Sequence, residues 1–522
     1  MRKLPAIFLF SAIILQAALH AQPITNVLVD PNSTDGECTI VINPANPNHI
    51  LAAANPDVLY RSSDAGLTWT RFNLSPFAST NLIGDVALAA DLNGNYYCQD
   101  LDGGFLFRTL KSTDMGVTWN TETVFGDAGW VEDKNWLTVD RTPSSPYVGN
   151  LYCAWTRRSN GPPADPGYIF VNHSSNGGVS WVPRDTLFSD FSSPAIPPIG
   201  TGLAVGPAGE IGISWGGGLP NTIRFKKSLD GGNTWPVNSV VVDNNVQPAT
   251  DYYDNISHPI NFSAQFTSLA ADISGGSYNG NLYCVWDDVR NGVDNADIFL
   301  ARSSDGGTTW TTQRINDDLT TRNQGVPTVA VDPTTGWVYV SYLDGRLNTD
   351  GFDDTLNYYL AWSQDGGMTF QNVRISQQSS TVNYIHSDYM GMDAYGGKCH
   401  LLWVGGPGVQ KTWTACVTQN QLLSAGTELT VSKTLLLFPA VPNPSIDFTT
   451  FDFEISDASA VSITVTDING RIVAQPMNNV NYQAGRHQFR LEHHQIGLAA
   501  GTYVATISSS LGQSSRKFII AD

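Results

Sequence analysis

The sequence predicts an all-β protein made of a repeated four-stranded unit and a smaller β-domain. Glycine (48 residues) and proline (28 residues) separate short apolar runs, which is typical of tight turns between strands. One eight-residue motif recurs six times between residues 62 and 370. At 522 residues the chain exceeds one ordinary hydrophobic core, so we expect two folded units.

The N-terminal segment has the pattern of a secretory leader. Arg2 and Lys3 precede the apolar residues 7–15, and the small residue Ala21 ends the segment. We therefore expect residues 1–21 to be a signal peptide that directs export through the Sec route. No later run reaches the roughly 18 apolar residues of a membrane span. The formal net charge of -19 argues against nucleic acid as a partner.

The repeated motif is a turn that reads Ser-Ser-Asp-Gly-Gly-Thr-Thr-Trp at residues 303–310. Its aspartate can accept hydrogen bonds from the backbone of its own turn, a glycine supplies a positive φ, and the aromatic ring packs between sheets. The third position of each copy therefore has a structural role. The residues at this position are Asp64, Asp114, Asn176, Asp230, Asp305 and Asp365.

Each copy lies between the third and fourth strands of a predicted four-stranded unit, and such units are typical of β-propeller blades. After the sixth copy three more strands are predicted, and residues 24–29 can supply their missing fourth strand. Closure by this N-terminal strand would remove exposed sheet edges. We expect a propeller over residues 22–420 with seven blades, and six blades is the alternative.

These copies resemble the Asp-box (BNR) repeats of sialidase-like propellers, with Asn176 and Phe370 as departures from the pattern. The resemblance implies the fold of the sialidase superfamily. It also implies an arginine in a segment before the first repeat, but no basic residue lies between Lys3 and Arg61. The first arginine of a sialidase carboxylate clamp is therefore missing.

After a linker at residues 421–437, residues 438–522 show the alternation of a small β-sandwich. Pro442-Asn443-Pro444, the Asp467–Arg471 turn, the Leu498–Tyr503 motif and the Lys517-Phe518 pair resemble the C-terminal sorting domain of the type IX secretion system. The resemblance implies the type IX secretion machinery as a partner, passage through the outer membrane, and removal of the domain with attachment to the cell surface.

The loops opposite the repeated turns are where propellers usually bind ligands. In one interpretation, arginines there clamp an anion or sugar, Asp133 or Asp388 protonates a glycosidic oxygen, and Tyr389 or an aspartate is the nucleophile. In a second, the arginines pair with neighbouring carboxylates and hold the loops. In a third, calcium is bound by Asp287, Asp288, Asp294 and Asp297, or by Asp350, Asp353 and Asp354. The remaining candidate ligand-binding residues are Trp130, Arg157, Arg158, Asp287, Arg290, Asp344 and Arg346.

The leading hypothesis is an exported or cell-surface propeller that binds a glycan or another extracellular ligand on its channel face. The first alternative is a glycoside hydrolase resembling an exo-sialidase, with Asp133 or Asp388 as acid/base and Arg290 and Arg346 as clamp. The second alternative is a structural or adhesive surface protein. The six cysteines lie mostly in predicted strands, which favours free thiols over disulfides.

Overall fold

The computed structural model describes residues 24–32, 36–159, 167–182, 185–188, 199–217, 222–247, 266–292, 295–348, 355–380, 389–406, 410–428, 435–437, 440–455, 458–468, 470–483, 485–509 and 512–521. Within these residues the chain is nearly all β, with one α-helix and two short 3-10 helices, η1 (Ser75–Phe77) and η2 (His494–Ile496). The described helices include none long and apolar enough to cross a membrane.

The strands up to residue 418 form seven four-stranded antiparallel sheets, six of which follow the chain order. The first and second sheets are β2 (Cys38–Ile42), β3 (Ile50–Ala54), β4 (Val58–Ser62) and β5 (Thr70–Asn73), then β6 (Leu82–Ala90), β7 (Tyr96–Asp102), β8 (Phe107–Ser112) and β9 (Asn120–Phe125). The third and fourth sheets are β10 (Trp130–Val139), β11 (Leu151–Ser159), β12 (Tyr168–Ser174) and β13 (Asp185–Phe188), then β14 (Ile199–Val205), β15 (Ile211–Gly216), β16 (Ile223–Ser228) and β17 (Val240–Asp243).

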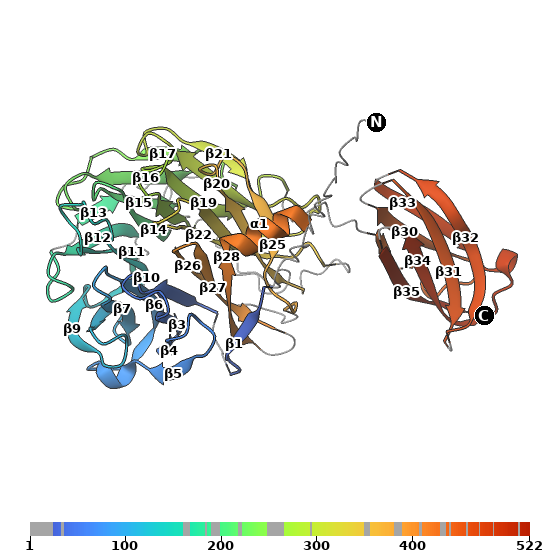
Figure 1. Cartoon of the computed structure of the whole chain (residues 1–522), viewed down its shortest axis with the longest axis horizontal. Coiled ribbons are helices and arrows are strands. Elements are labelled where there is room, and N and C mark those ends of the chain that lie inside the picture. Colours follow the sequence, from blue (N-terminus) through green and yellow to red (C-terminus); the bar gives the residue numbers. More distant parts are fainter. Residues whose placement is uncertain are drawn as a thin grey trace, which may run out of the picture.

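The fifth and sixth sheets repeat the same order. They are β18 (Ser268–Ala271), β19 (Leu282–Asp288), β20 (Asp297–Ser303) and β21 (Thr311–Arg314), then β22 (Gln324–Val331), β23 (Val338–Asp344), β24 (Asn357–Ser363) and β25 (Gln371–Arg374). The first strand of each sheet contacts the first strand of the next sheet, and the seventh sheet returns to contact the first. The sheets therefore form a closed ring around a central channel (Figure 1).

The seventh sheet joins the two ends of this ring. It contains β26 (Gly391–Tyr395), β27 (Lys398–Gly405) and β28 (Lys411–Thr418), and its outer strand is the N-terminal β1 (Asn26–Asp30). Strand β1 runs antiparallel to β28, with Asn26 opposite Ala415. The amide of Asn26 also bonds the chain after β25, because its Nδ2 donates to the carbonyl of Ile375 at 3.0 Å. The N-terminal segment supplies the fourth strand, as the sequence predicted.

The repeated turns join the third and fourth strands of six sheets. In the turn at residues 303–310, Asp305 accepts bonds from the Ser303 hydroxyl and from the backbone N–H and hydroxyl of Thr309, at 2.6–2.9 Å. Bonding to the Thr309 hydroxyl is the main cause that lowers the pKa of Asp305 to about 2. Asn176 makes the equivalent bonds with Ser174 and Ser180.

In the seventh sheet, helix α1 (Gln419–Glu428) stands where the other sheets have the repeated turn. Thr418 ends β28, and its hydroxyl accepts from the N–H of Gln421 at 3.2 Å, while the Gln421 amide oxygen accepts from the N–H of Thr418 at 2.9 Å. This reciprocal pair is a capping box, which favours a helix start. Helix α1 begins in the last two residues of the predicted propeller and continues into the predicted linker, and Leu422 is buried in the propeller core.

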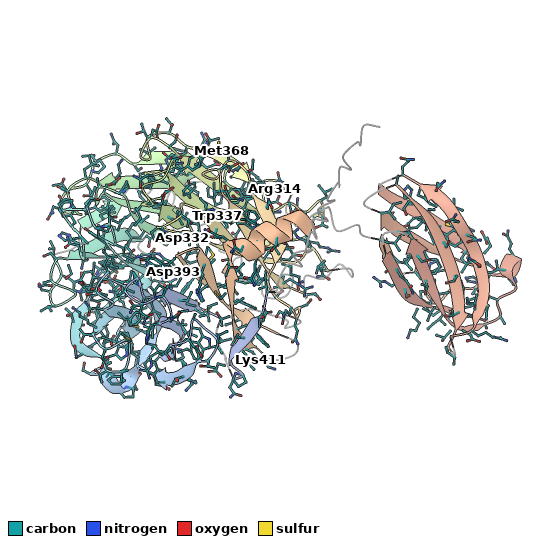
Figure 2. All side chains as sticks on the ribbon, viewed as in Figure 1. Arg314, Asp332, Trp337, Met368, Asp393 and Lys411 are labelled. Atoms are coloured by element: carbon teal, nitrogen blue, oxygen red, sulfur yellow. The ribbon has the colours of Figure 1, made fainter. Side chains whose placement is uncertain are left out.

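The core lies between neighbouring sheets and is rich in aromatic side chains. Trp155, Trp215 and Trp286 lie in the second strands of three sheets and are fully buried. All six cysteines are free, and five of them are buried. Figure 2 shows Met368, from the last repeated turn, at the rim of the ring and Asp393 nearer its centre.

The C-terminal domain consists of two packed sheets. One has the order β29 (Leu435–Leu437), β30 (Phe448–Ile455) and β33 (Gly485–Glu492), and the other β32 (Ile472–Tyr482), β31 (Ser459–Asp467), β34 (Gly501–Ser509) and β35 (Gly512–Ile520). Because β29 pairs with β30, the predicted linker contains one strand of this domain. The Pro-Asn-Pro segment meets the last strand, where Asn443 accepts from the N–H of Ile519 at 2.8 Å.

Candidate functional site

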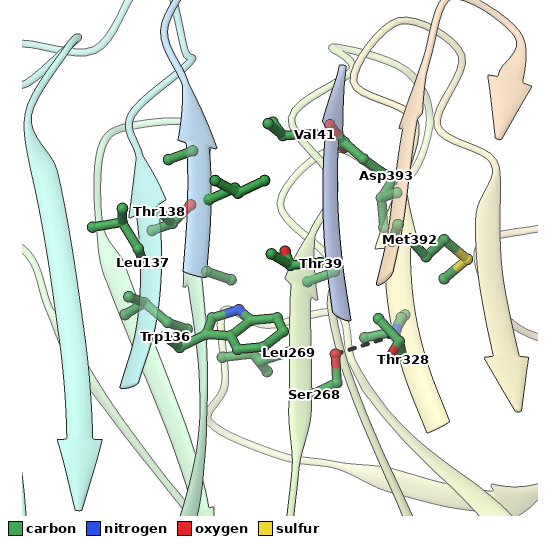
Figure 3. Close-up of a pocket in the computed structure, with 18 of the residues that line it drawn as sticks. Thr39, Val41, Trp136, Leu137, Thr138, Ser268, Leu269, Thr328, Met392 and Asp393 are labelled. Carbon is green, nitrogen blue, oxygen red and sulfur yellow. Dashed lines mark hydrogen bonds between the residues drawn. The ribbon is translucent and has the colours of Figure 1, made fainter. Parts of the chain in front are cut away.

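The central channel contains a cavity of about 170 Å³, lined by the first strands of all seven sheets. Figure 3 shows Asp393 at one end of this cavity and the indole of Trp136 at the other. Arg141, which follows β10 on the side of the repeated turns, faces Asp393 with both terminal nitrogens 3.5 Å from its oxygens. Trp136 also lines a smaller pocket beyond the cavity, toward the face opposite the repeated turns.

A β-bulge in β10 shapes that opposite end. The pairing of β10 with β11 shifts between Asp133 and Trp136, and Lys134 takes a positive φ of 50°. A bulge re-aims the side chains around it. The ammonium of Lys134 consequently lies 3.4 Å from the ring centre of Tyr389 and 4.5 Å from that of Trp136. The Lys134 side chain is almost fully buried in this aromatic setting.

Two carboxyl groups adjoin this lysine. Asp85 belongs to a similar bulge in β6, has a φ of 58°, and accepts a bond from the backbone N–H of Lys134 at 2.9 Å. Asp133 forms an ion pair with Arg158, whose side chain is 45% exposed. Burial, followed by the charge of Asp85, raises the pKa of Asp133 to about 6. We name this group of Asp85, Asp133, Lys134, Trp136 and Tyr389 the channel mouth.

Arg157, by contrast, is part of the framework of the third sheet. Its guanidinium bonds Glu132 within β10 and bonds Asp127, before β10, at 2.6 Å. The same Glu132 accepts from the indole N–H of Trp155 at 2.6 Å. Arg157 also stacks 4.6 Å from the ring of Phe170. Two carboxylates and an aromatic ring thus hold a guanidinium that is only 4% exposed.

The same arrangement recurs at Arg290 in the fifth sheet. Arg290 bonds Asp288 of its own sheet at 2.5 Å and Asp243 of the preceding sheet at 3.2 Å. Its guanidinium stacks 4.1 Å from the ring of Phe299, which occupies the position of Phe170 in the third sheet.

Arg346 of the sixth sheet follows this pattern as well. It bonds Asp344 at 2.7 Å and Asp317, from the segment leaving the fifth sheet, at 2.5 Å, and it stacks 4.3 Å from Tyr359. Burial raises the pKa of Asp344 to about 6, although Arg346 opposes the shift. Each of these three arginines therefore joins its own sheet to the segment arriving from the preceding one.

The acidic residues considered for calcium are engaged within the protein. Asp287 accepts from the N–H of Val326 at 2.9 Å, and burial raises its pKa to about 7. Asp288 accepts from Arg290 and from the indole of Trp286. Outside the described residues lie Asp294, Asp350, Asp353 and Asp354. Among the described residues, no group of three His, Cys, Asp or Glu side chains could hold a metal ion.

The remaining candidates occupy different positions on the same face. Tyr389 enters the channel mouth, where its ring meets Trp136 edge-on and its hydroxyl donates to the carbonyl of Val86 at 3.3 Å. Trp130 begins β10 and meets Tyr168 edge-on, beside Arg157. Asp388 lies outside the described residues. Tyr389 lines the smaller pocket together with Lys134 and Trp136, whereas Asp133, Arg158, Arg290 and Arg346 lie outside the linings of both pockets described above. Asp133 and Arg158 are joined by their ion pair.

Sequence reasoning missed Asp85, Lys134 and Trp136 as components of one site. Each belongs to an inner strand, where alternation predicts simple core or channel positions. The bulges that re-aim Asp85 and Lys134 leave no clear sequence signal, since neither residue is a glycine. The available signal was the run of charged residues Glu132-Asp133-Lys134 close to Trp136.

Comparison with known families identifies the C-terminal domain. Residues 440–521 match the family described as "Secretion system C-terminal sorting domain". This match indicates engagement with the type IX secretion system and a secreted or surface location. No curated protein matches the chain significantly.

Several solved structures resemble the propeller at low sequence identity. A Hadza microbial sialidase is 11% identical over 71% of this chain and 73% of its own, with a TM-score of 0.40. The GH93 α-L-arabinofuranosidase of Fusarium graminearum is 12% identical over 76% of this chain and 98% of its own, with a TM-score of 0.42. YCF48 from Cyanidioschyzon merolae is 11% identical over 76% and 99%, with a TM-score of 0.43. The fold described above rests on the strand pairing, not on these similarities.

Proposed function

We propose that this protein is a secreted or surface-displayed propeller that binds a glycan at the channel mouth. The observation that carries the proposal is the ion pair of Asp133 and Arg158 next to Lys134, whose ammonium lies over the rings of Trp136 and Tyr389. Ligand sites in proteins commonly combine such aromatic walls with a few convergent polar groups. Titratable groups with shifted pKa values also concentrate at functional sites, and Asp133 is one.

A sugar suits this chemistry because its hydroxyls need strong acceptors. An ionised carboxylate can accept two hydroxyl bonds, and bonds to ionised groups are stronger than neutral ones. The half-exposed Arg158 adds donors at the rim of the site. The indole of Trp136 offers an apolar ring at the base. Asp133, Arg158 and Trp136 would thus contact the ligand, while Asp85 and Lys134 would position Asp133.

The pairing of the framework arginines favours glycan binding without hydrolysis. Arg157, Arg290 and Arg346 are each held by two carboxylates, so none of them is left to clamp a substrate carboxylate. Tyr389 donates its hydroxyl to a backbone carbonyl and carries the ammonium of Lys134 over its ring.

A glycoside hydrolase is the second candidate, and one observation favours it. A general acid works best when its pKa lies near the working pH, and the pKa of Asp133 is raised to about 6. Turnover of an aryl glycoside that disappears in Asp133→Asn would support this candidate. Binding that is retained without any turnover supports the leading proposal.

Export through the Sec route and processing of both ends belong to the same proposal. Residues 1–21 are the proposed signal peptide and lie outside the described residues. We propose that the sorting domain is removed after passage through the outer membrane and that the propeller is attached to the cell surface. Mass spectrometry of the propeller recovered from the native cell surface tests both cuts, and an intact sorting domain on the surface protein would contradict the second.

The ligand is best found on a glycan array and then measured by calorimetry. We expect Asp133→Asn to lower the affinity for the captured glycan by about 10- to 100-fold, since one hydrogen bond to a charged acceptor is removed. Affinity of the wild-type protein should rise between about pH 5 and pH 7, as Asp133 ionises near its pKa of about 6. Asp317→Asn removes an exposed carboxylate on the same face and is the matched control. Equal affinity of both variants would refute the site.

A further inference from the structure

A further pocket lies between the sixth and seventh sheets, apart from the channel. It is lined by the starts of β24 and β28, the end of β27 and the segment after β25. Its volume of about 40 Å³ exceeds the roughly 10–15 Å³ that one water molecule needs. None of the described residues that line this pocket carries a charge, although the chain as a whole is acidic. The pocket therefore suits a neutral group.

The amide of Asn357 supplies an unused donor in this pocket. The side chain is 1% exposed, and its Nδ2 has no hydrogen-bond partner among the described residues. Its orientation is fixed from the other side, because Arg374 donates to the hydroxyl of Ser379, which donates in turn to Asn357 Oδ1 at 3.0 Å. A buried donor left unpaired costs about 1–3 kcal/mol, so a bound acceptor would relieve this cost.

The hydroxyl of Ser380 is the second unused polar group. Ser380 is 6% exposed, and its Oγ also lacks a partner among the described residues. Its backbone is held in place by reciprocal bonds with Leu356, at 2.7 and 2.9 Å. A hydroxyl can donate and accept, so Ser380 and Asn357 together match a ligand group that does both.

Aromatic rings also line the pocket. Trp403 stacks on Tyr358 with a centroid distance of 5.1 Å and is nearly buried. Trp413 lies opposite Trp403 in the strand pairing, is half-buried, and has its indole N–H bonded to the carbonyl of Gly405 at 3.1 Å. Its nitrogen is therefore occupied, and the ring offers an apolar surface.

We propose that this pocket is a second sugar site, which takes the hydroxymethyl arm of a neutral hexose. The hydroxyl of the arm accepts from Asn357 Nδ2 and exchanges a hydrogen bond with Ser380 Oγ, while the sugar ring lies against Trp413. A hydroxymethyl group fits because it is uncharged, small, and both donor and acceptor at one atom. The inference rests on the proposed function insofar as both sites take parts of a glycan, but the two sites share no residue.

Ser380→Ala is the sharpest test of this site. The hydroxyl has no partner to lose within the described protein, so the melting temperature should stay at the wild-type value. We expect calorimetry with methyl glucoside, methyl galactoside and methyl mannoside to show binding of at least one of them. The affinity for that sugar should fall about 5- to 10-fold in Ser380→Ala, as expected for one neutral hydrogen bond.

A second variant and a control separate this site from the channel mouth. Asn357→Asp keeps the oxygen that accepts from Ser379 and replaces the pocket donor with an acceptor, so we expect binding of the methyl glycoside to be lost. Asp133→Asn should leave it unchanged. If Ser380→Ala and Asn357→Asp both bind the methyl glycosides like the wild type, or if none of the three sugars binds the wild type, the second site is refuted. Failure of the channel mouth would instead appear as an unaltered glycan affinity in Asp133→Asn.

Discussion

Arg346→Ala tests whether the paired arginines hold the propeller together. The Arg346 side chain is 14% exposed and bonds Asp344, which is fully buried, and Asp317, which is 55% exposed. Removal of one partner of a buried ion pair costs about 3–5 kcal/mol, because the other charge stays buried. Loss of the stacking on Tyr359 adds to this cost. We expect the free energy of unfolding in urea to fall by about 3–5 kcal/mol.

The pH dependence of this loss follows from Asp344. With Arg346 present, the pKa of Asp344 is about 6. Without the arginine, this pKa rises further, well above the value of about 3.9 in the unfolded chain. When the pKa of a carboxyl group is higher in the folded chain than in the unfolded chain, its contribution to stability is fully present at a pH below the pKa of the unfolded chain. That contribution is lost as the pH rises through the pKa of the folded chain. Arg346→Ala should therefore be less destabilising at pH 5 than at pH 8.

Arg158→Ala is the control, since Arg158 also pairs with an aspartate but is 45% exposed. An exposed pair contributes about 0–1 kcal/mol. Arg346→Lys should be intermediate, because lysine keeps the charge and loses the planar fork. The structural role of Arg346 is wrong if the free energy of unfolding of Arg346→Ala lies within about 1 kcal/mol of the wild-type value, or if it equals that of Arg158→Ala.

Three further predictions concern the framework. Asp305→Ala should lower the free energy of unfolding by about 1 kcal/mol, as the loss of a helix cap does, and Asp305→Asn should lower it by less, because Asn176 fills the same position in its own turn. Since the pKa of Asp305 is about 2, its contribution to stability in thermal unfolding should fade as the pH falls from about 4 to 2. Gly307→Ala should lower the melting temperature far more than Gly275→Ala. Both glycines have a positive φ, but only a Cβ at residue 307 would come within 2.2 Å of the Phe225 side chain. Equal melting temperatures of the two variants would contradict this packing. Deletion of residues 24–30 should expose the edge of β28 and cause self-association in light scattering, whereas a stable monomer would show that β1 is dispensable.

Much of the fold could be predicted because the six copies of the turn motif support the same assignment of strands around each copy. The six copies of one turn gave the position of third and fourth strands, and the strands left over after residue 370 predicted the closing role of the N-terminal segment. Helix α1 was harder to predict, because its start depends on the Thr418–Gln421 capping pair. Among its residues whose burial the structure describes, Leu422 is the buried apolar side chain, and the segment shows no extended apolar stripe in the sequence.

The candidate site was less predictable, since it depends on which charged side chains form ion pairs in the folded chain. The sequence placed Arg290 and Arg346 on the correct type of loop, but their partners Asp243 and Asp317 come from preceding sheets and show no spacing signal. The roles of Asp85 and Lys134 depend on bulges, which arise from the pairing of two strands and not from either residue alone. Asn357 and Ser380 stand out only when their missing hydrogen-bond partners are known.

The most direct test of the central claim is calorimetric titration of the propeller, at pH 7, with the glycan that it captures on an array. We expect the wild type and Asp317→Asn to bind with the same affinity and Asp133→Asn to bind about 10- to 100-fold more weakly. Capture of no glycan by the wild type, or full affinity in Asp133→Asn, would contradict a glycan site at the channel mouth.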